Sequence, residues 1–220
     1  DGKFQRNSDM TPLDFCKRTV DLQYESFVSL IHDPRNPYYH RYIVEQSMPI
    51  EGAQSSIFLN IPIQEMKDMC QHMLRDGKPV WFACNVEEEL DDDDGLWDQQ
   101  LYNLPGFYGL ESSSSMAHST MTKTERIQYG GAMGTHVMLI TAVDLDANDN
   151  VPRRWRVENS WGDDAGNDGY YTMNDNWFDD NVFEIVSPKD YLSPAATAAL
   201  DTEPVVLPAW DPMCDYGKRK

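Results

Sequence analysis

A net charge of -19 over 220 residues makes this chain strongly acidic, and such a charge disfavours binding to the phosphate backbone of nucleic acids. Hydrophobic residues form 40% of the sequence, which is enough for a packed core, while no apolar run is long enough to span a bilayer. The four scattered cysteines form no Cys-x-x-Cys pair, so we expect no zinc cluster, and their low density and irregular spacing favour free thiols in a reducing compartment. We expect no other metal and no cofactor.

The amino-terminal part of the chain predicts a capped helix and a strand. Thr11 can cap a helix that begins at Pro12, and Asp14 can close its capping box. The apolar run at 27–31 indicates a strand. Residues 33–37 contain two prolines, each of which disfavours helix before it, so we expect a turn or loop there.

The next part predicts a buried helix between two strands. Residues 57–59 are a short strand candidate, and 60–75 form the clearest helical pattern in the chain, ending near Gly77. The methionines of this helix are expected to be packing residues. Residues 79–86 are almost continuously apolar, which is typical of a buried strand.

An acidic run at 87–94 follows this strand. We expect a solvated loop rather than a cation site, because the run lacks the glycine-punctuated spacing of calcium ligands. Residues 96–108 are irregular and aromatic, four serines at 112–115 indicate a loop, and 122–127 predict a helical turn.

The last part of the chain predicts one strand, one helix and an extended tail. Residues 182–186 form the strand, and Ser193-Pro194 opens an alanine-rich helix that ends near Leu200. Three prolines within 203–213 favour an extended tail over a helix.

The most informative stretch is a predicted hairpin. The β-rich runs 134–143 and 155–162 flank a segment dense in Asp and Asn, which is typical of antiparallel strands joined by a loop. A loop centred just after residue 147 sets His136 directly opposite Asn159, and opposed residues project to the same face. A register slip of one residue would separate the pair.

A His and an Asn side by side at the ends of two strands form a catalytic arrangement. The Asn amide can hold the imidazole in one tautomer while the other ring nitrogen acts on a nucleophile. A lone His beside an apolar strand is more often a structural residue, so the hypothesis rests on the pair. The candidate catalytic residues are therefore His136 and Asn159.

Several short motifs resemble those of a known family. Asn-Ser-Trp-Gly at 159–162, with Gly-Tyr following at 169–170, is similar to the pattern around the orienting Asn of papain-like cysteine peptidases. Within that group, the motifs Leu-Pro-Ala-Trp-Asp-Pro-Met at 207–213, Trp-Phe-Ala-Cys at 81–84 and Asp-Pro-Arg at 33–35 resemble the bleomycin hydrolase family. The resemblance covers nearly the whole chain.

The resemblance implies an α+β papain-like fold, of which this chain would be the β-barrel-rich carboxyl-terminal half with flanking helices. Residues 1–202 would belong to the peptidase domain, and 203–220 would form an extended tail near the active-site cleft. It also implies a cytoplasmic homohexamer that acts on peptides with a free amino terminus. His136 would pair with a Cys thiolate and protonate the leaving amine, Asn159 would orient His136, and Trp161 would shield their hydrogen bond.

The nucleophile of the family stands in a Cys-Trp motif, which this sequence lacks. Because the chain also begins at Asp1, we expect a fragment without peptidase activity of its own. Cys16, Cys70 and Cys84 are expected to be buried packing residues, and Cys214 lies in a tail that cannot hold attack geometry well. The alternatives are a catalytically inactive remnant or partner chain, and a nucleic-acid-binding module that the net charge disfavours.

The tail departs from the family pattern after Met213. Residues 214–220 have a different sequence with a basic end, which we expect to weaken the restriction to substrates with a free amino terminus. We expect 207–213 to pack in extended form along the protein, and 218–220 to stay solvated. The expected apolar anchors are Val205, Val206, Leu207, Trp210 and Met213.

Overall fold

The computed structural model describes residues 2–4, 6, 9–20, 24–47, 56–102, 104–109, 121–148 and 150–215. The strands are β1 (Phe27–Ile31), β2 (Arg41–Val44), β3 (Phe58–Asn60), β4 (Val80–Cys84), β5 (Leu90–Asp91), β6 (Leu96–Trp97), β7 (His136–Leu145), β8 (Pro152–Glu158), β9 (Tyr170–Asn174), β10 (Val182–Pro188) and β11 (Val205–Leu207). The helices are α1 (Pro12–Thr19), α2 (Ile63–Arg75), α3 (Leu104–Phe107), α4 (Lys123–Gln128), α5 (Asp175–Asn181) and α6 (Pro194–Ala199), with 3-10 turns η1 (Tyr24–Ser26), η2 (Lys189–Tyr191) and η3 (Pro212–Asp215). Across this described part of the chain, every helix falls short of the length and apolarity that a bilayer crossing requires.

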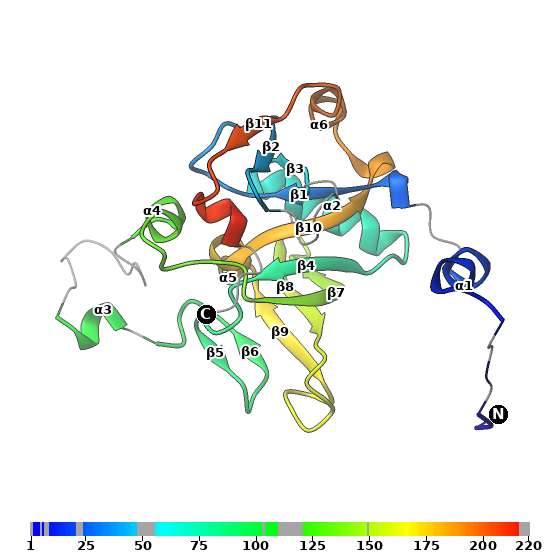
Figure 1. Cartoon of the computed structure of the whole chain (residues 1–220). Helices are drawn as coiled ribbons and strands as arrows, with labels where there is room; N and C mark the ends of the chain where they lie inside the picture. The colour runs from blue at the N-terminus through cyan, green and yellow to red at the C-terminus, as the bar shows by residue number, and fades with distance from the viewer. Residues whose placement is uncertain are drawn as a thin grey trace.

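One large mixed sheet organises the molecule. Its strand order is β11-β2-β3-β1-β10-β4-β7-β8-β9-β6-β5, so strands from both ends of the chain lie in the same sheet. Figure 1 shows the sheet twisting between β1 and β9, with short helices at its sides. A single large sheet with few helices confirms the predicted α+β class.

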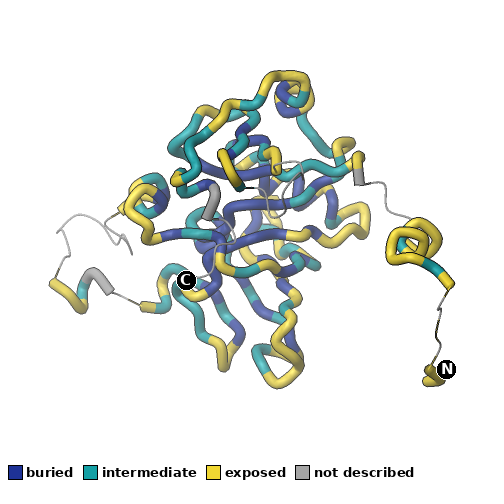
Figure 2. Tube along the Cα trace, in the orientation of Figure 1, coloured by how far each residue is buried: buried dark blue, intermediate teal, exposed yellow. Residues whose placement is uncertain are grey.

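The main core forms where α2 covers the sheet. Figure 2 shows the buried stretches, in dark blue, concentrated along the central strands. The buried side chains of α2 pack in one cluster with side chains of β4, β7 and β8, and the α2 members are Met66, Met69, Cys70 and Met73. The prediction that these methionines are packing residues is therefore confirmed.

The helix α2 begins three residues later than predicted, at Ile63. Asn60 ends β3 instead, because its side-chain amide is hydrogen-bonded to the backbone of Asp33. The Asn60 Nδ2 donates to the Asp33 carbonyl at 2.9 Å, and its Oδ1 accepts from the Asp33 N–H at 2.8 Å. A side chain that substitutes for backbone partners in this way favours a strand end over a helix interior.

Other predicted elements are confirmed with small changes of boundary. They are the strands at 27–31, 58–60, 80–84 and 182–188 and the helices at 123–128 and 194–199. The capping boxes of α1 and α4 are both formed, by Thr11 with Asp14 and by Thr122 with Glu125. The predicted serine loop at 112–115 lies outside the described residues.

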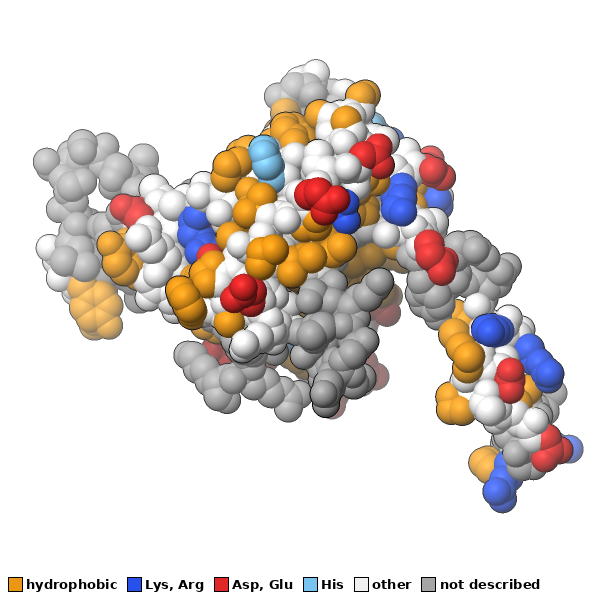
Figure 3. Space-filling model, turned by 45° about the horizontal axis from the view of Figure 1, so that its top comes forward, with side chains coloured by type: hydrophobic (Ala, Val, Ile, Leu, Met, Phe, Trp, Pro, Cys, Tyr) orange, Lys and Arg blue, Asp and Glu red, His pale blue; other side chains and the backbone are white. Residues whose placement is uncertain are grey.

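The helix α1 forms as predicted but buries none of its side chains. Leu13, Phe15 and Val20 are 61%, 47% and 42% exposed, and Figure 1 shows the helix standing apart from the sheet. Figure 3 shows hydrophobic and basic side chains together on this projecting helix. The prediction that Cys16 is a buried packing residue is wrong, since this side chain is only half-buried.

The acidic run is not simply a solvated loop. Leu90–Asp91 and Leu96–Trp97 pair as a small antiparallel hairpin, and the second of these strands joins β9 at the edge of the sheet. The predicted irregular segment 96–108 therefore starts with a strand and also contains α3. Trp97 anchors the hairpin, because it is fully buried and its Nε1 donates to the Val86 carbonyl at 3.0 Å.

The tail packs on the protein, but only two of the five predicted anchors, Leu207 and Met213, pack against a core cluster. Residues 205–207 pair in parallel with β2, while Val205, Val206 and Trp210 are 43%, 59% and 82% exposed. Met213 is the deeply buried tail residue, at 1% exposure, and lies against Ile31, Tyr42 and Val44. It sits in the 3-10 turn η3 rather than in extended chain, and the predicted solvated end at 218–220 lies outside the described residues.

Candidate active site

His136 begins β7 at the point where that strand meets the end of β4. It is the Cα partner of Cys84, the last residue of β4. The preceding residue fixes this junction: the Thr135 N–H donates to the Cys84 carbonyl at 2.8 Å, and the Thr135 Oγ1 accepts from the Val86 N–H at 3.0 Å. The imidazole is therefore carried by a strand end that is hydrogen-bonded on the β4 side.

His136 and Asn159 are hydrogen-bonded, as the sequence predicts. The distance between His136 Nε2 and Asn159 Oδ1 is 2.8 Å. The predicted register is nevertheless wrong by two residues, because Leu139 pairs with Glu158 and a bulge follows between Ile140 and Ala142. A slip of two residues keeps a side chain on its original face, so the pair still forms.

The orientation of the Asn159 amide identifies the protonated ring nitrogen. The Ser160 N–H, which can only donate, meets the Asn159 Oδ1 at 2.8 Å. The same oxygen therefore accepts from His136 Nε2, and a neutral imidazole carries its proton on that nitrogen. The Nδ1 atom is then the basic nitrogen of His136, available to a nucleophile.

Trp161 covers the imidazole. The two rings stack with centroids 5.0 Å apart and an interplanar angle of 29°, and Trp161 itself is 44% exposed. An indole placed between solvent and an imidazole lowers the local dielectric, which strengthens a nearby hydrogen bond. The position of Trp161 thus fits the shielding role that the resemblance implies.

Cys84 lies opposite His136 but belongs to the core. Its side chain is fully buried in the main hydrophobic cluster, and burial raises the pKa of its thiol well above the ordinary value. Burial raises the pKa of Cys70 in the same way. Because a nucleophilic cysteine must be accessible and readily deprotonated, these two thiols are structural, as predicted.

In the part of the chain that the structure describes, the remaining cysteines and the acidic groups form no further candidate site. Cys16 lies on the projecting α1, and the side chain of Cys214 lies outside what the structure describes. Among the described residues, no three His, Cys, Asp or Glu side chains are grouped so that they could hold a metal ion. The His136–Asn159 pair is therefore the candidate catalytic group of the described residues.

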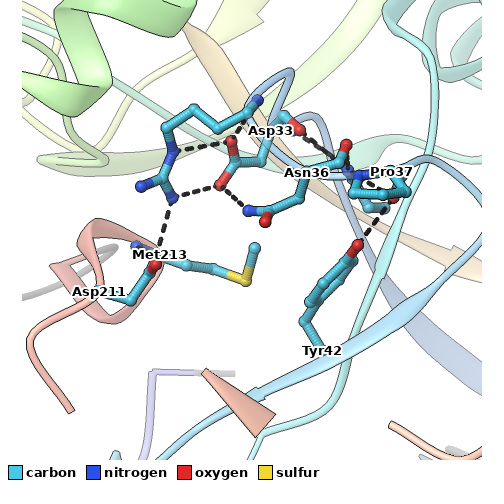
Figure 4. A network of polar contacts seen from close by, with 8 residues as sticks. Asp33, Asn36, Pro37, Tyr42, Asp211 and Met213 are labelled. Atoms are coloured by element: carbon cyan, nitrogen blue, oxygen red, sulfur yellow. Dashed lines mark hydrogen bonds and ion pairs between the residues drawn. The ribbon is translucent and has the colours of Figure 1, made fainter. Parts of the chain in front are cut away.

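An ion-pair network, which the sequence analysis did not predict, connects the tail to the rest of the protein. The Arg35 Nη2 lies 2.6 Å from Asp33 Oδ2 and 2.9 Å from Asp211 Oδ1, and Asp33 is fully buried. The same Asp211 oxygen accepts from the Met213 N–H at 2.8 Å. Figure 4 shows Asp33 bonded to Asn36 on one side and to the guanidinium that reaches Asp211 on the other, with Met213 beside Asp211. Asp-Pro-Arg and Asp-Pro-Met, noted above only as family motifs, are thus in contact.

The chain is similar in sequence to known peptidases. Residues 1–214 match the peptidase C1-like family. Bleomycin hydrolase from Gallus gallus is 37% identical over 209 residues, covering 93% of this chain and 45% of the relative. Aminopeptidase C from Listeria monocytogenes is 34% identical over 215 residues, covering 97% of this chain and 47% of the relative.

A solved structure is similar in both sequence and fold. The crystal structure of PepW from Lactobacillus rhamnosis HN001 has a TM-score of 0.83 and 35% sequence identity, covering 92% of this chain and 45% of that chain. The present chain therefore spans about half the length of the relatives it matches.

Proposed function

This chain belongs to the peptidase C1-like family, and from that premise we propose that it carries the His–Asn part of the active site of a cysteine aminopeptidase. The observation that carries this proposal is the 2.8 Å hydrogen bond between His136 Nε2 and Asn159 Oδ1. It is supported by similarity to proteins named aminopeptidase C and bleomycin hydrolase. The substrates would be peptides with a free amino terminus.

In the proposed reaction, a Cys thiolate paired with protonated His136 attacks the carbonyl carbon of the first peptide bond. His136 Nδ1 then delivers its proton to the leaving amine, which departs and leaves a thioester. Water attacks the thioester, with the same nitrogen removing a proton from it, and the free amino acid and thiol are released. Asn159 keeps the imidazole oriented through both steps.

We propose that the nucleophile comes from a segment outside this chain. The sequence contains no Cys-Trp motif, and Cys84, the cysteine opposite His136, is buried with a raised thiol pKa. The chain alone would then lack peptidase activity. The absence of the motif also keeps a second candidate in view, a catalytically inactive remnant or partner chain.

We also propose an oligomeric state, a location and a path of the tail for the complete enzyme. By its family, the complete protein would assemble as a homohexamer in the cytoplasm, with residues 203–220 near the active-site cleft. The fastening of the tail by Arg35 and Asp211 supports a defined path for that segment. The net charge of -19 supports peptides rather than nucleic acid as partners.

The proposal can be tested by reconstitution. The purified chain should not cleave aminoacyl-coumarin substrates, and co-expression with the amino-terminal half of a related aminopeptidase C should restore cleavage. His136→Ala should then lower kcat by at least about a thousandfold, because triad members act as a unit. His72→Ala, a change at an exposed histidine of α2, is the control and should leave kcat unchanged.

Two results would contradict this function. One is a reconstituted enzyme whose His136→Ala variant keeps its rate. The other is cleavage by the chain alone that disappears when one of its own four cysteines is replaced. Failure of reconstitution with every related half would instead favour the inactive partner chain.

A further inference from the structure

Trp161 covers His136 from a loop rather than from a strand. It lies on the segment 159–169, between the end of β8 and the start of β9. The two ends of this segment are joined, because the Asn159 N–H donates to the Gly169 carbonyl at 3.1 Å. Trp161 is 44% exposed, so solvent surrounds part of its indole. The contacts that hold the loop and the indole therefore determine whether His136 stays covered.

The loop lies against the turn of the acidic hairpin, which consists of β5, β6 and their connection, residues 90–97. A Cβ atom on Gly95, in this turn, would lie 2.7 Å from the Cα of Gly166, in the loop, a distance that real Cβ atoms do not reach. Gly95 also has a φ of +63°, which side chains rarely allow. Its carbonyl accepts from the Thr172 N–H of β9 at 2.8 Å. Glycine at position 95 thus lets hairpin and loop meet backbone to backbone.

The same contact continues to Tyr171 on β9. A Cβ atom on Gly166 would lie 3.1 Å from Tyr171 Cε2, so the loop backbone is in direct contact with this ring. The hairpin holds the ring as well: Tyr171 stacks on Trp97 with centroids 4.6 Å apart, and its Oη donates to Asp92 Oδ1 at 2.6 Å. Because Tyr171 is also only 2% exposed, its ring has a fixed place.

Tyr171 in turn contacts the indole of Trp161. The two rings meet edge-on, with centroids 6.1 Å apart at 86°, which is a favoured geometry for an aromatic pair. Trp161 then stacks on His136 with centroids 5.0 Å apart. A continuous set of contacts therefore runs from the acidic hairpin to the imidazole.

We propose that the acidic hairpin positions Trp161 over His136, with Gly95 and Tyr171 as the positioning residues. Gly95 fixes the loop that carries Trp161, and Tyr171 fixes the edge of the indole. The geometric part of this proposal stands without any activity. Its catalytic meaning, protection of the His136–Asn159 hydrogen bond from water, rests on the proposed function.

The test measures in the purified chain how far Trp161 covers His136. The ring current of a stacked indole shifts the proton resonances of an imidazole, so Trp161→Ala gives the position of an uncovered His136, and His136→Gln gives the assignment. Spectra are recorded well above the ordinary imidazole pKa, so that protonation does not contribute. Gly95→Ala should move the His136 resonances most of the way to their position in Trp161→Ala, because the added methyl group would occupy the place of the Gly166 backbone.

The matched control is Gly77→Ala at the end of α2. Gly77 has a φ of +71°, but within the described part of the chain no atom beyond its own neighbours lies within 4 Å of an added Cβ. This change therefore imposes the backbone strain without the contact. The exposed His72 should keep its resonances in Gly95→Ala. Unchanged His136 resonances in Gly95→Ala, or equal changes in the two glycine variants, would overturn the proposal.

Tyr171→Phe decides the proposal if Gly95→Ala does not fold. It keeps the ring on Trp97, removes the bond to Asp92, and should move the His136 resonances in the same direction by less. Tyr191→Phe is its control, since this hydroxyl also donates to a carboxylate, Asp76 Oδ2, at 2.6 Å. If Tyr171→Phe changes the His136 resonances no more than Tyr191→Phe does, the proposal fails.

The catalytic meaning is tested separately in the reconstituted enzyme. Gly95→Ala should lower kcat by about ten- to a hundredfold, since misplacing a catalytic group by about 1 Å can cost about a hundredfold. An active enzyme whose Gly95→Ala variant keeps its kcat would overturn the catalytic part. An enzyme that stays inactive in every reconstitution would count against the proposed function, while the His136 resonances of the chain alone would still decide the position of Trp161.

Discussion

His136 and Cys84 face each other across β7 and β4, yet their surroundings give them different chemistry. The imidazole lies at the strand end, bonded to Asn159 and covered by a half-exposed indole. The thiol points into an apolar cluster, where burial disfavours its ionised form. Position in the sheet thus brings two reactive residue types together, and burial decides which of them remains available.

Glu184 shows the same effect of burial on a carboxyl group. It is 8% exposed on β10 and accepts a hydrogen bond from the Ser29 hydroxyl. Desolvation raises its pKa above the ordinary 4.5, which the bond from Ser29 only partly offsets. The folded chain therefore holds this proton to a higher pH than the unfolded chain, and stability falls as pH rises above about 4.5 through the folded-state pKa.

We predict that Glu184→Gln is more stable than the parent chain near neutral pH, with the difference vanishing below about pH 4.5, where both side chains are neutral. Urea unfolding across this pH range measures the free energy of unfolding. Glu158→Gln, at an exposed position on β8, is the control and should show no such pH-dependent gain. A Glu184→Gln variant that loses stability at neutral pH would contradict the prediction.

At the scale of elements, the tail is held by one strand, one ion-pair network and one side chain. β11 pairs with β2, Arg35 joins Asp33 to Asp211, and Met213 fills a small apolar cluster. Figure 4 shows Tyr42 beside this network, and its hydroxyl donates to the Pro37 carbonyl at 3.0 Å. The network connects the loop after β1 with residues near the end of the described chain.

Arg35→Met should release the tail. Removing one partner leaves the fully buried Asp33 carboxylate uncompensated, so we expect the free energy of unfolding to fall by about 3–5 kcal/mol. Urea unfolding measures this loss, and limited proteolysis should cut residues 207–213 earlier than in the parent chain. Arg153→Met, at a 54% exposed ion pair, should cost less than about 1 kcal/mol. Equal losses in the two variants would contradict a special role for Arg35.

At the scale of the whole molecule, a strong acidic excess coexists with one continuous sheet. Asp and Glu number 37 against 18 Lys and Arg, so most acidic side chains have no basic counterpart. Self-repulsion of this kind keeps a protein soluble and destabilises its compact state. The acidic hairpin at the sheet edge concentrates part of this charge close to Tyr171.

We therefore predict that the melting temperature rises when sodium chloride is raised from low to physiological concentration, because salt screens exposed charges within about 10 Å. Differential scanning calorimetry at several ionic strengths measures this. A variant with Asp93→Asn and Asp94→Asn, both at exposed positions, should show a smaller rise. A melting temperature that falls with added salt would contradict the prediction.

Local patterns in the sequence determined the elements and the His136–Asn159 pair. Caps, prolines and apolar periods are properties of neighbouring residues, so α1, α4, α6 and the strand β4 could be predicted. The pair was predictable although the register was wrong by two, because strand side chains alternate with a period of two and an even slip preserves the face.

Only the tertiary structure decided which distant side chains meet. Tyr171 and Asp92 are 79 positions apart, and Arg35 and Asp211 are 176 apart. No local pattern encodes such contacts, since they depend on the strand order that brings β9 beside β6 and folds the tail back onto β2. The same holds for the tail anchors: apolar character suggested Trp210 and Met213 alike, but the surface left open by β1 and β2 buries Met213 and leaves Trp210 82% exposed.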